Sequence, residues 1–158
     1  MKTDWRKVPT FGVHMGEPSV IRPSAYGVVA DDRGQLAIVR SPRGVFLPGG
    51  GIDAGETPEE AVKREMIAEC GLIVQPGTWR VQAIQFVYSE PERTHFEKRC
   101  TFIESAGAGH NSSGLEPDHE LIRVRPEVAT QMLSHQSHCW AVECWRKHLK
   151  ELNDAASI

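Results

Sequence analysis

Residues 49–71, GGGIDAGETPEEAVKREMIAECG, decide the fold of this chain and hold most of its chemistry. The stretch opens with glycines and then carries the strongest helix signal in the sequence. Thr57 is a good N-cap and Pro58 suits the first helical position, while Glu60, three residues after Thr57, completes a capping box. The sequence therefore predicts a helix that begins at Pro58 and is ended by Gly71 in the left-handed conformation.

Two glutamates of this predicted helix lie on its apolar side. On a helical wheel, Glu65 and Glu69 fall in the middle of an arc of small and apolar residues, four positions apart, so that their side chains are neighbours. Partial burial of two carboxylates costs free energy unless a cation compensates their charge. A hard divalent ion such as Mg²⁺ or Mn²⁺ would do so, and a salt bridge to Arg64 is the alternative. The arc consists of Ala61, Val62, Met66, Ala68 and Leu72.

The glycines before the helix indicate a loop that approaches phosphate. Gly50 and Gly55 have the spacing of a P-loop, but Glu56 stands where that motif requires lysine. A carboxylate there would repel a phosphate unless a metal ion lay between them. The loop and the helix together therefore favour phosphate binding through a metal ion over direct cradling by the backbone.

The rest of the chain alternates between strand-like and helical segments, which predicts an α/β or α+β sandwich with helices packed on sheets. Residues 105–114 are small and polar and are expected to form a mobile loop. The expected strands are 25–30, 35–40, 44–47, 79–89, 94–105 and 121–124, and the expected further helices are 126–133 and 136–151.

Composition excludes several classes of protein. The chain has 158 residues and a net charge of −3, so it has no global basic field and long nucleic acids are not expected partners. No apolar run approaches the roughly 20 residues of a membrane span. Residues 1–17 lack the layout of a signal peptide, and no Cys-x-x-Cys pair is present, so we expect a cytoplasmic protein. A homodimer is compatible with the sequence.

Residues 50–72 resemble the Nudix box, G-x5-E-x7-R-E-U-x-E-E-x-G-U, where U is a bulky aliphatic residue. Eight of the nine fixed positions match. The resemblance implies the Nudix fold, an α/β/α sandwich with a central mixed β-sheet. It would place a single catalytic domain at residues 23–151, between an N-terminal arm at 1–22 and a C-terminal tail at 152–158. The matching residues are Gly50, Glu56, Arg64, Glu65, Met66, Glu69, Gly71 and Leu72.

The resemblance also implies an activity, the Mg²⁺-dependent hydrolysis of a phosphoanhydride bond in a nucleoside diphosphate linked to another moiety, with Mn²⁺ as the alternative ion. The expected partner is a small nucleotide. Glu65 and Glu69 would be the metal ligands. Arg64 would orient a carboxylate, Glu56 would brace the loop, and Gly50 would permit the tight backbone path.

Ala68 departs from the family's pattern, because the first glutamate of the Glu-Glu pair normally stands there. Loss of this carboxylate should lower metal affinity, and a non-catalytic nucleotide-binding module is therefore the alternative function. Another carboxylate could replace it, although each candidate is also compatible with a surface role. The candidates are Glu97, Glu116, Asp118 and Glu120.

Four residues are expected to contact substrate. Gly50 and Gly51 belong to the loop, and Arg40 ends the strand that leads toward it. Tyr88 lies 16 residues after Leu72, and some dinucleoside-polyphosphate hydrolases of the Nudix family carry a tyrosine at about that distance. The alternative for Tyr88 is a strand aromatic residue that packs on the sheet, and the alternative for Arg40 is a surface charge.

Overall fold

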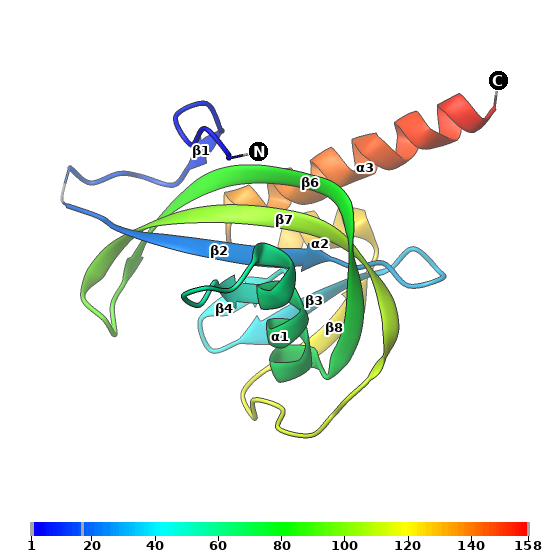
Figure 1. Ribbon diagram of the computed structural model, residues 1–158, viewed down its shortest axis with the longest axis horizontal. Coiled ribbons are helices and arrows are strands. Elements are labelled where there is room, and N and C mark those ends of the chain that lie inside the picture. The colour runs from blue at the N-terminus through cyan, green and yellow to red at the C-terminus, as the bar shows by residue number, and fades with distance from the viewer. Residues whose placement is uncertain (1, 17, 158) are drawn as a thin grey trace.

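The computed structural model of the protein describes residues 2–16 and 18–157 (Figure 1). Met1 and Glu17 of the predicted arm, and Ile158 of the predicted tail, lie outside the described residues. The strands are β1 (Thr10–Phe11), β2 (Val20–Val28), β3 (Leu36–Ser41), β4 (Gly44–Phe46), β5 (Gly49–Gly51), β6 (Leu72–Ser89), β7 (Thr94–His110) and β8 (Glu120–Val124). The helices are α1 (Pro58–Cys70), α2 (Pro126–Met132) and α3 (Gln136–Ala156).

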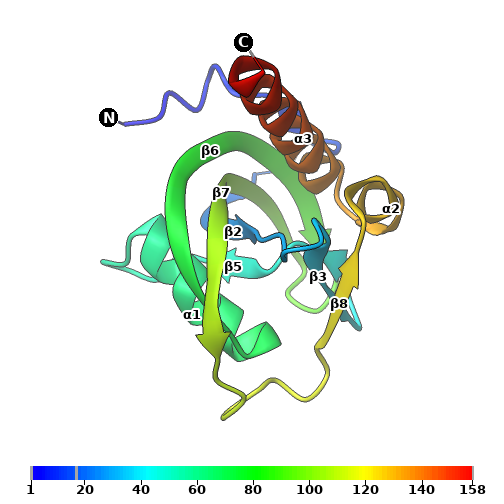
Figure 2. The ribbon, with the colours of Figure 1, turned by 90° about the vertical axis from the view of Figure 1, so that its right-hand side faces the viewer.

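Two sheets form the centre of the molecule. The larger sheet is mixed, in the order β1-β6-β7-β2-β5, and the smaller one is antiparallel, in the order β4-β3-β8. In the mixed sheet β2 runs parallel to β7 and antiparallel to β5. Helix α1 lies on one side of these strands and α2 and α3 lie on the other (Figure 2). The predicted α/β sandwich with a mixed sheet is confirmed.

The alternation of side chains along β2 divides the core into two parts. Tyr26 and Val28 point into a cluster that also contains buried residues of α2 and α3. Ala25, and Val29 directly after β2, lie on the opposite side, in a cluster with buried residues of α1. Since successive side chains of a strand face opposite ways, one strand packs against both helical layers. The start of β5 pairs with the middle of β2, where Gly49 is the register partner of Tyr26.

Helix α1 begins and ends where the sequence predicts. The Thr57 hydroxyl accepts a hydrogen bond from the Glu60 N–H at 3.1 Å, and the Glu60 carboxylate accepts one from the Thr57 N–H at 3.0 Å. Gly71 has a φ of 67°, in the left-handed region that favours glycine. These caps fix the rotation and length of the helix, and hence the direction in which its carboxylates project.

The segment predicted as a mobile loop is mostly strand, so that prediction is wrong for residues 105–110. Strand β7 continues to His110 and pairs with the first residues of β6, from Leu72 to Pro76. The small residues of this segment do not show the alternating β-branched and aromatic side chains by which a strand is predicted. The pairing is made by backbone groups, and register shifts after Ile73 and after Pro76 accommodate the irregular path.

Two elements cross the predicted bounds of the catalytic domain, which stay a prediction. β2 begins at Val20, inside the predicted arm. Pro23 is tolerated in this strand. Its carbonyl accepts a hydrogen bond from the Ile52 N–H. Because the nitrogen and the carbonyl of one strand residue face the same side, the missing N–H lies where β5 has ended and leaves no paired strand without a donor. At the other end α3 continues through the predicted tail to Ala156, since residues 152–156 contain neither glycine nor proline. Within the described part of the chain, no helix is long and apolar enough to cross a membrane.

We predict that Thr57→Ala destabilises the protein by about 1 kcal/mol, because the substitution removes the hydroxyl that caps α1. Thermal unfolding followed by circular dichroism should show a lower midpoint by roughly 2–4 °C. Thr78→Ala is the matched control, since Thr78 is exposed and its hydroxyl has no described hydrogen bond. Equal midpoints for the two variants would show that the cap does not stabilise α1.

Candidate active site

Arg64 ties helix α1 to the glycine-rich segment before it. Its guanidinium donates two hydrogen bonds to the Glu56 carboxylate, at 2.8 and 2.9 Å, and a third to the Gly51 carbonyl at 2.9 Å. Glu56 in turn accepts from the Asp53 N–H at 2.9 Å. The Arg64 guanidinium lowers the pKa of Glu56 to about 2. Glu56 is therefore an ionised brace of the loop and not a group that exchanges protons near neutral pH.

Glu65 and Glu69 lie together against β5. Their side chains are only 17% and 13% exposed. Glu65 accepts a hydrogen bond from Arg64 at 2.6 Å, and Glu69 accepts one from the Gly49 N–H at 2.8 Å. A Cβ atom at Gly50 would lie 3.2 Å from the Glu65 carboxylate, so the lack of a side chain at Gly50 leaves room for that group.

Negative charge is unfavourable at this pair. Burial, followed by repulsion from Glu65 and Glu116, raises the pKa of Glu69 to about 8, although the Gly49 N–H opposes the change. Burial also raises the pKa of Glu65, although Arg64 lowers it. One guanidinium already shared with Glu56 does not compensate two carboxylates. A hard divalent cation would, so the residues present fit the magnesium ion that the sequence predicts.

Glu116 lies beside the place where Ala68 leaves a carboxylate missing. The Glu116 N–H donates to the Ala68 carbonyl at 2.9 Å, and the Glu116 charge raises the pKa of both Glu65 and Glu69. His119 lies in the same group, with its Nδ1 3.0 Å from the Glu116 carboxylate and its Nε2 3.7 Å from the Glu69 carboxylate. Glu116, Asp118 and His119 offer three ligand atoms within 4.8 Å of one another.

The other two candidate carboxylates lie in ion pairs of their own. Glu97 binds Arg99 at 2.8 Å, and Glu120 lies 3.6 Å from Arg40. Of the four candidates, the structure brings Glu116 to the helix carboxylates, and Asp118 lies beside it at His119.

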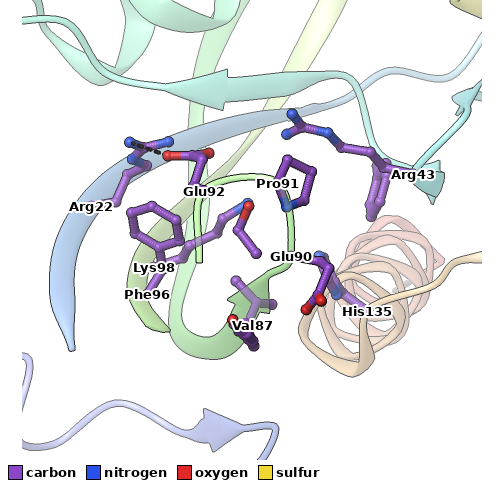
Figure 3. A pocket seen from close by; sticks show the side chains of 12 residues that line it. Arg22, Arg43, Val87, Glu90, Pro91, Glu92, Phe96, Lys98 and His135 are labelled. Carbon is purple, nitrogen blue, oxygen red and sulfur yellow. Dashed lines mark ion pairs between the residues drawn. The ribbon is translucent and has the colours of Figure 1, made fainter. Parts of the chain in front are cut away.

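An inner cavity adjoins Glu69, and an outer cavity shares part of its lining. The inner cavity, of about 210 Å³, is lined by the three glycines of β5 and by Glu69 and His119. The outer cavity, of about 280 Å³, lies at the turn between β6 and β7 and is lined by Val87, Tyr88 and Phe96 among others (Figure 3). The residues that line both cavities are Arg22, Arg43, Phe46, Lys98 and His135. Through these shared residues the inner cavity at Glu69 borders the outer cavity, which has aromatic rings in its lining.

The predicted substrate residues are only partly brought together. Gly50 and Gly51 line the inner cavity. Tyr88 lines the outer one, where it stacks on His95 with ring centroids 4.7 Å apart. Arg40 lines neither cavity, and its substrate contact stays a prediction.

Sequence reasoning missed Lys98 and His119 as residues of the cavities. His119 lies on an irregular segment, where no pattern marks it. Lys98 could have been found, because it interrupts a row of alternating apolar residues, Phe96, Cys100 and Phe102.

Comparison with known proteins agrees with this geometry. The model of the NUDIX domain matches residues 20–138. The 8-oxo-dGTP diphosphatase of Haemophilus influenzae is 38% identical over 55 residues, which are 31% of this chain and 40% of that protein. The ADP-ribose pyrophosphatase of Methanocaldococcus jannaschii is 42% identical over 71 residues, 42% of this chain and 39% of that protein. The matched region thus spans well under half of either relative.

A solved structure shows the same fold. The NUDIX hydrolase from Nitrosomonas europaea superposes with a TM-score of 0.63 at 16% sequence identity, over 80% of this chain and 89% of that one.

We predict that the metal-free protein loses stability between about pH 7 and pH 8.5 because of Glu69. Folded, this carboxyl keeps its proton up to about pH 8, whereas its ordinary pKa is 4.5. The unfolded chain therefore binds fewer protons in this range, and stability falls as pH rises. Burial lowers the pKa of His135 to about 4 and that of His138 further, so neither imidazole changes its protonation between pH 7 and pH 8.5.

Calorimetric unfolding in EDTA should show that wild type loses about 1 kcal/mol, or roughly 3 °C, more than Glu69→Gln over this range. Saturating Mg²⁺ should remove the excess loss, because the ion binds the ionised carboxylate. Parallel curves of stability against pH for the two proteins in EDTA would contradict the raised pKa of the buried Glu69 carboxyl.

Proposed function

Because the chain belongs to the Nudix family, we propose that it hydrolyses a phosphoanhydride bond in a nucleoside diphosphate linked to another moiety, with Mg²⁺ as its cofactor. One observation carries the proposal, the joint projection of the mostly buried Glu65 and Glu69 carboxylates toward the glycines of β5. The cavity lined by Glu69 borders, at three cationic side chains, an outer cavity with aromatic rings in its lining. A diphosphate with an organic group attached has the charge and shape for the two cavities.

Glu65 and Glu69 would hold the ion, and Glu116 is the residue that we expect to replace the carboxylate missing at Ala68. When bound, a magnesium ion supplies neutralisation of the diphosphate charge and polarisation of the bond to be cleaved. Because the Glu116 charge raises the pKa of both helix carboxylates, its proximity supports metal binding and opposes a purely structural role.

The protein's own groups position these carboxylates. Arg64 holds Glu65 by one hydrogen bond and uses the rest of its guanidinium to fix the loop through Glu56 and Gly51. The Gly49 N–H fixes one oxygen of Glu69 and leaves the other toward His119. Little reorganisation is then needed when substrate and ion arrive, which is the main source of rate in this kind of reaction.

We predict magnesium-dependent release of a phosphate-containing product from at least one member of a substrate panel. The panel contains nucleoside triphosphates, 8-oxo-dGTP, ADP-ribose and dinucleoside polyphosphates. Glu69→Gln should lower kcat by about 100-fold or more, because it removes a charged ligand of the ion. The matched control is Glu151→Gln on the exposed end of α3.

Circular dichroism of each variant establishes that the fold is kept. Substrates that raise the melting temperature without any turnover would contradict the proposal and favour the alternative, a nucleotide-binding module without catalysis, which the loss of a carboxylate at Ala68 would explain.

We predict that Glu116→Gln weakens Mg²⁺ binding by about tenfold in isothermal titration calorimetry, because one anionic ligand is lost. Adding Ala68→Glu to that variant should restore part of the affinity, since residue 68 lies next to Glu116. Glu120→Gln is the control, as its partner is Arg40. Wild-type affinity in Glu116→Gln would show that Glu116 is only a surface charge.

A further inference from the structure

His138, in the first turn of helix α3, is bound to the chain segment that leads into the glycines of β5. Its side chain is 1% exposed, and its Nδ1 accepts a hydrogen bond from the Leu47 N–H at 3.1 Å. A ring nitrogen that accepts a hydrogen bond carries no proton, so the imidazole is neutral and its proton lies on Nε2. Burial lowers the pKa of His138 well below its ordinary value, which agrees with a neutral ring.

An imidazole is an unfavourable side chain for this place. Its Nε2 has no hydrogen-bond partner among the described residues, 2–16 and 18–157. A buried N–H without an acceptor opposes folding, and an apolar side chain of similar size would avoid that cost. The surroundings suit an apolar side chain, since the rings of Tyr26 and Phe102 have their centroids 4.4 and 5.3 Å from that of His138. What the imidazole adds is one acceptor, Nδ1, for the Leu47 N–H.

The hydrogen bond to Leu47 reaches the metal-ligand candidate Glu69 through two further residues. Gly49, two positions after Leu47, donates its N–H to the Glu69 carboxylate at 2.8 Å. Between them the Pro48 carbonyl accepts from the Gly27 N–H at 2.8 Å. Residues 47–49 are all buried, and each makes one of these bonds. Displacement of the Leu47 N–H is therefore expected to displace the Gly49 N–H as well.

A ring contact connects His138 to the same glycine by a second route. Tyr26, on which the imidazole packs, is the register partner of Gly49. A Cβ atom at Gly49 would lie 2.6 Å from the Tyr26 Cα, so the two backbones are in close contact. The hydrogen bond and the ring contact thus both end at Gly49.

We propose that His138 is a positioning residue of the candidate active site, which fixes the Gly49 N–H through Leu47 and Tyr26 and so fixes the Glu69 carboxylate. The inference rests on the proposed function for its consequence, because there Glu69 is a ligand of the metal ion. His138 itself lines neither of the two cavities. Its effect on the site is exerted through the backbone.

Ser134 offers a matched control on the same edge of β4. Its hydroxyl accepts a hydrogen bond from the Val45 N–H at 2.9 Å, and its own N–H donates to the Val45 carbonyl at 2.8 Å. Ser134→Ala and His138→Leu each remove one acceptor of a backbone N–H. The bond lost in Ser134→Ala lies four residues before Gly49, so this variant shows what such a loss does to stability alone.

The first test is amide hydrogen exchange in the metal-free protein, followed for each residue by NMR. His138→Leu lacks the acceptor and should raise the exchange rate of the Gly49 amide by about tenfold or more, whereas Ser134→Ala should leave that rate unchanged. His138→Asn should keep most of the protection, because its amide oxygen is joined to Cγ as Nδ1 is. His138→Phe keeps a ring without the acceptor and should behave like His138→Leu, so the test does not depend on one substitution.

The second test is Mg²⁺ affinity, measured by titration calorimetry. His138→Leu should weaken binding by about tenfold, the usual effect of losing a group that orients a metal ligand. His138→Asn should bind nearly like wild type, although the gap that it leaves in the core lowers its melting temperature. If His138 only packs the core, the affinity should follow the melting temperature, and His138→Asn should also bind weakly.

Wild-type exchange at Gly49 in both His138→Leu and His138→Phe would overturn the inference, and so would weak Mg²⁺ binding in His138→Asn. The inference and the proposed function fail in different ways. If no substrate is hydrolysed while the exchange at Gly49 depends on His138, the positioning role stands and the proposed function does not. If substrates are hydrolysed while His138→Leu changes neither kcat nor the exchange at Gly49, the proposed function stands and the positioning role does not.

Discussion

Burial of the Glu65 and Glu69 carboxylates is the constraint around which the structure is built. The two carboxylates lie one helical turn apart and are mostly buried, and burial raises the pKa of both. Hydrogen bonds from Arg64 and Gly49 hold them in place, but the one Arg64 charge is shared between Glu65 and Glu56. A globular protein gains nothing from such a pair by itself, because buried like charges oppose folding. The pair becomes favourable only when a divalent cation enters between the helix and the glycines of β5.

The same constraint explains the surroundings of the pair. The capping box and Gly71 set the length and rotation of α1, so that both carboxylates face β5. Gly49 could not be another residue, since its φ is 151° and a Cβ there would meet the backbone of β2 at 2.1 Å. Glu116 approaches the helix at Ala68. Negative groups thus gather where a cation is expected.

Local signals predicted local structure well. The start, the end and the carboxylate face of α1 could be derived because the caps and the i,i+4 spacing act within a few residues. The continuation of β7 to His110 could not, because backbone pairing with Leu72–Pro76 outweighs the loop-like composition of that segment. The approach of Glu116 to Ala68 could not be derived either, because the two residues lie 48 positions apart and meet through one backbone hydrogen bond of 2.9 Å. Lys98 is intermediate, because its place in an apolar row is visible in the sequence but its place in the lining of both cavities is not.

Anomalous diffraction from crystals grown with Mn²⁺ tests the central claim most directly, because manganese reports its own position. The account predicts one strong peak between the side chains of Glu65 and Glu69, with oxygen atoms of both at roughly 2.1 Å. A well-ordered crystal at saturating Mn²⁺ with no peak there, or with the two carboxylates turned apart into solvent, would contradict it.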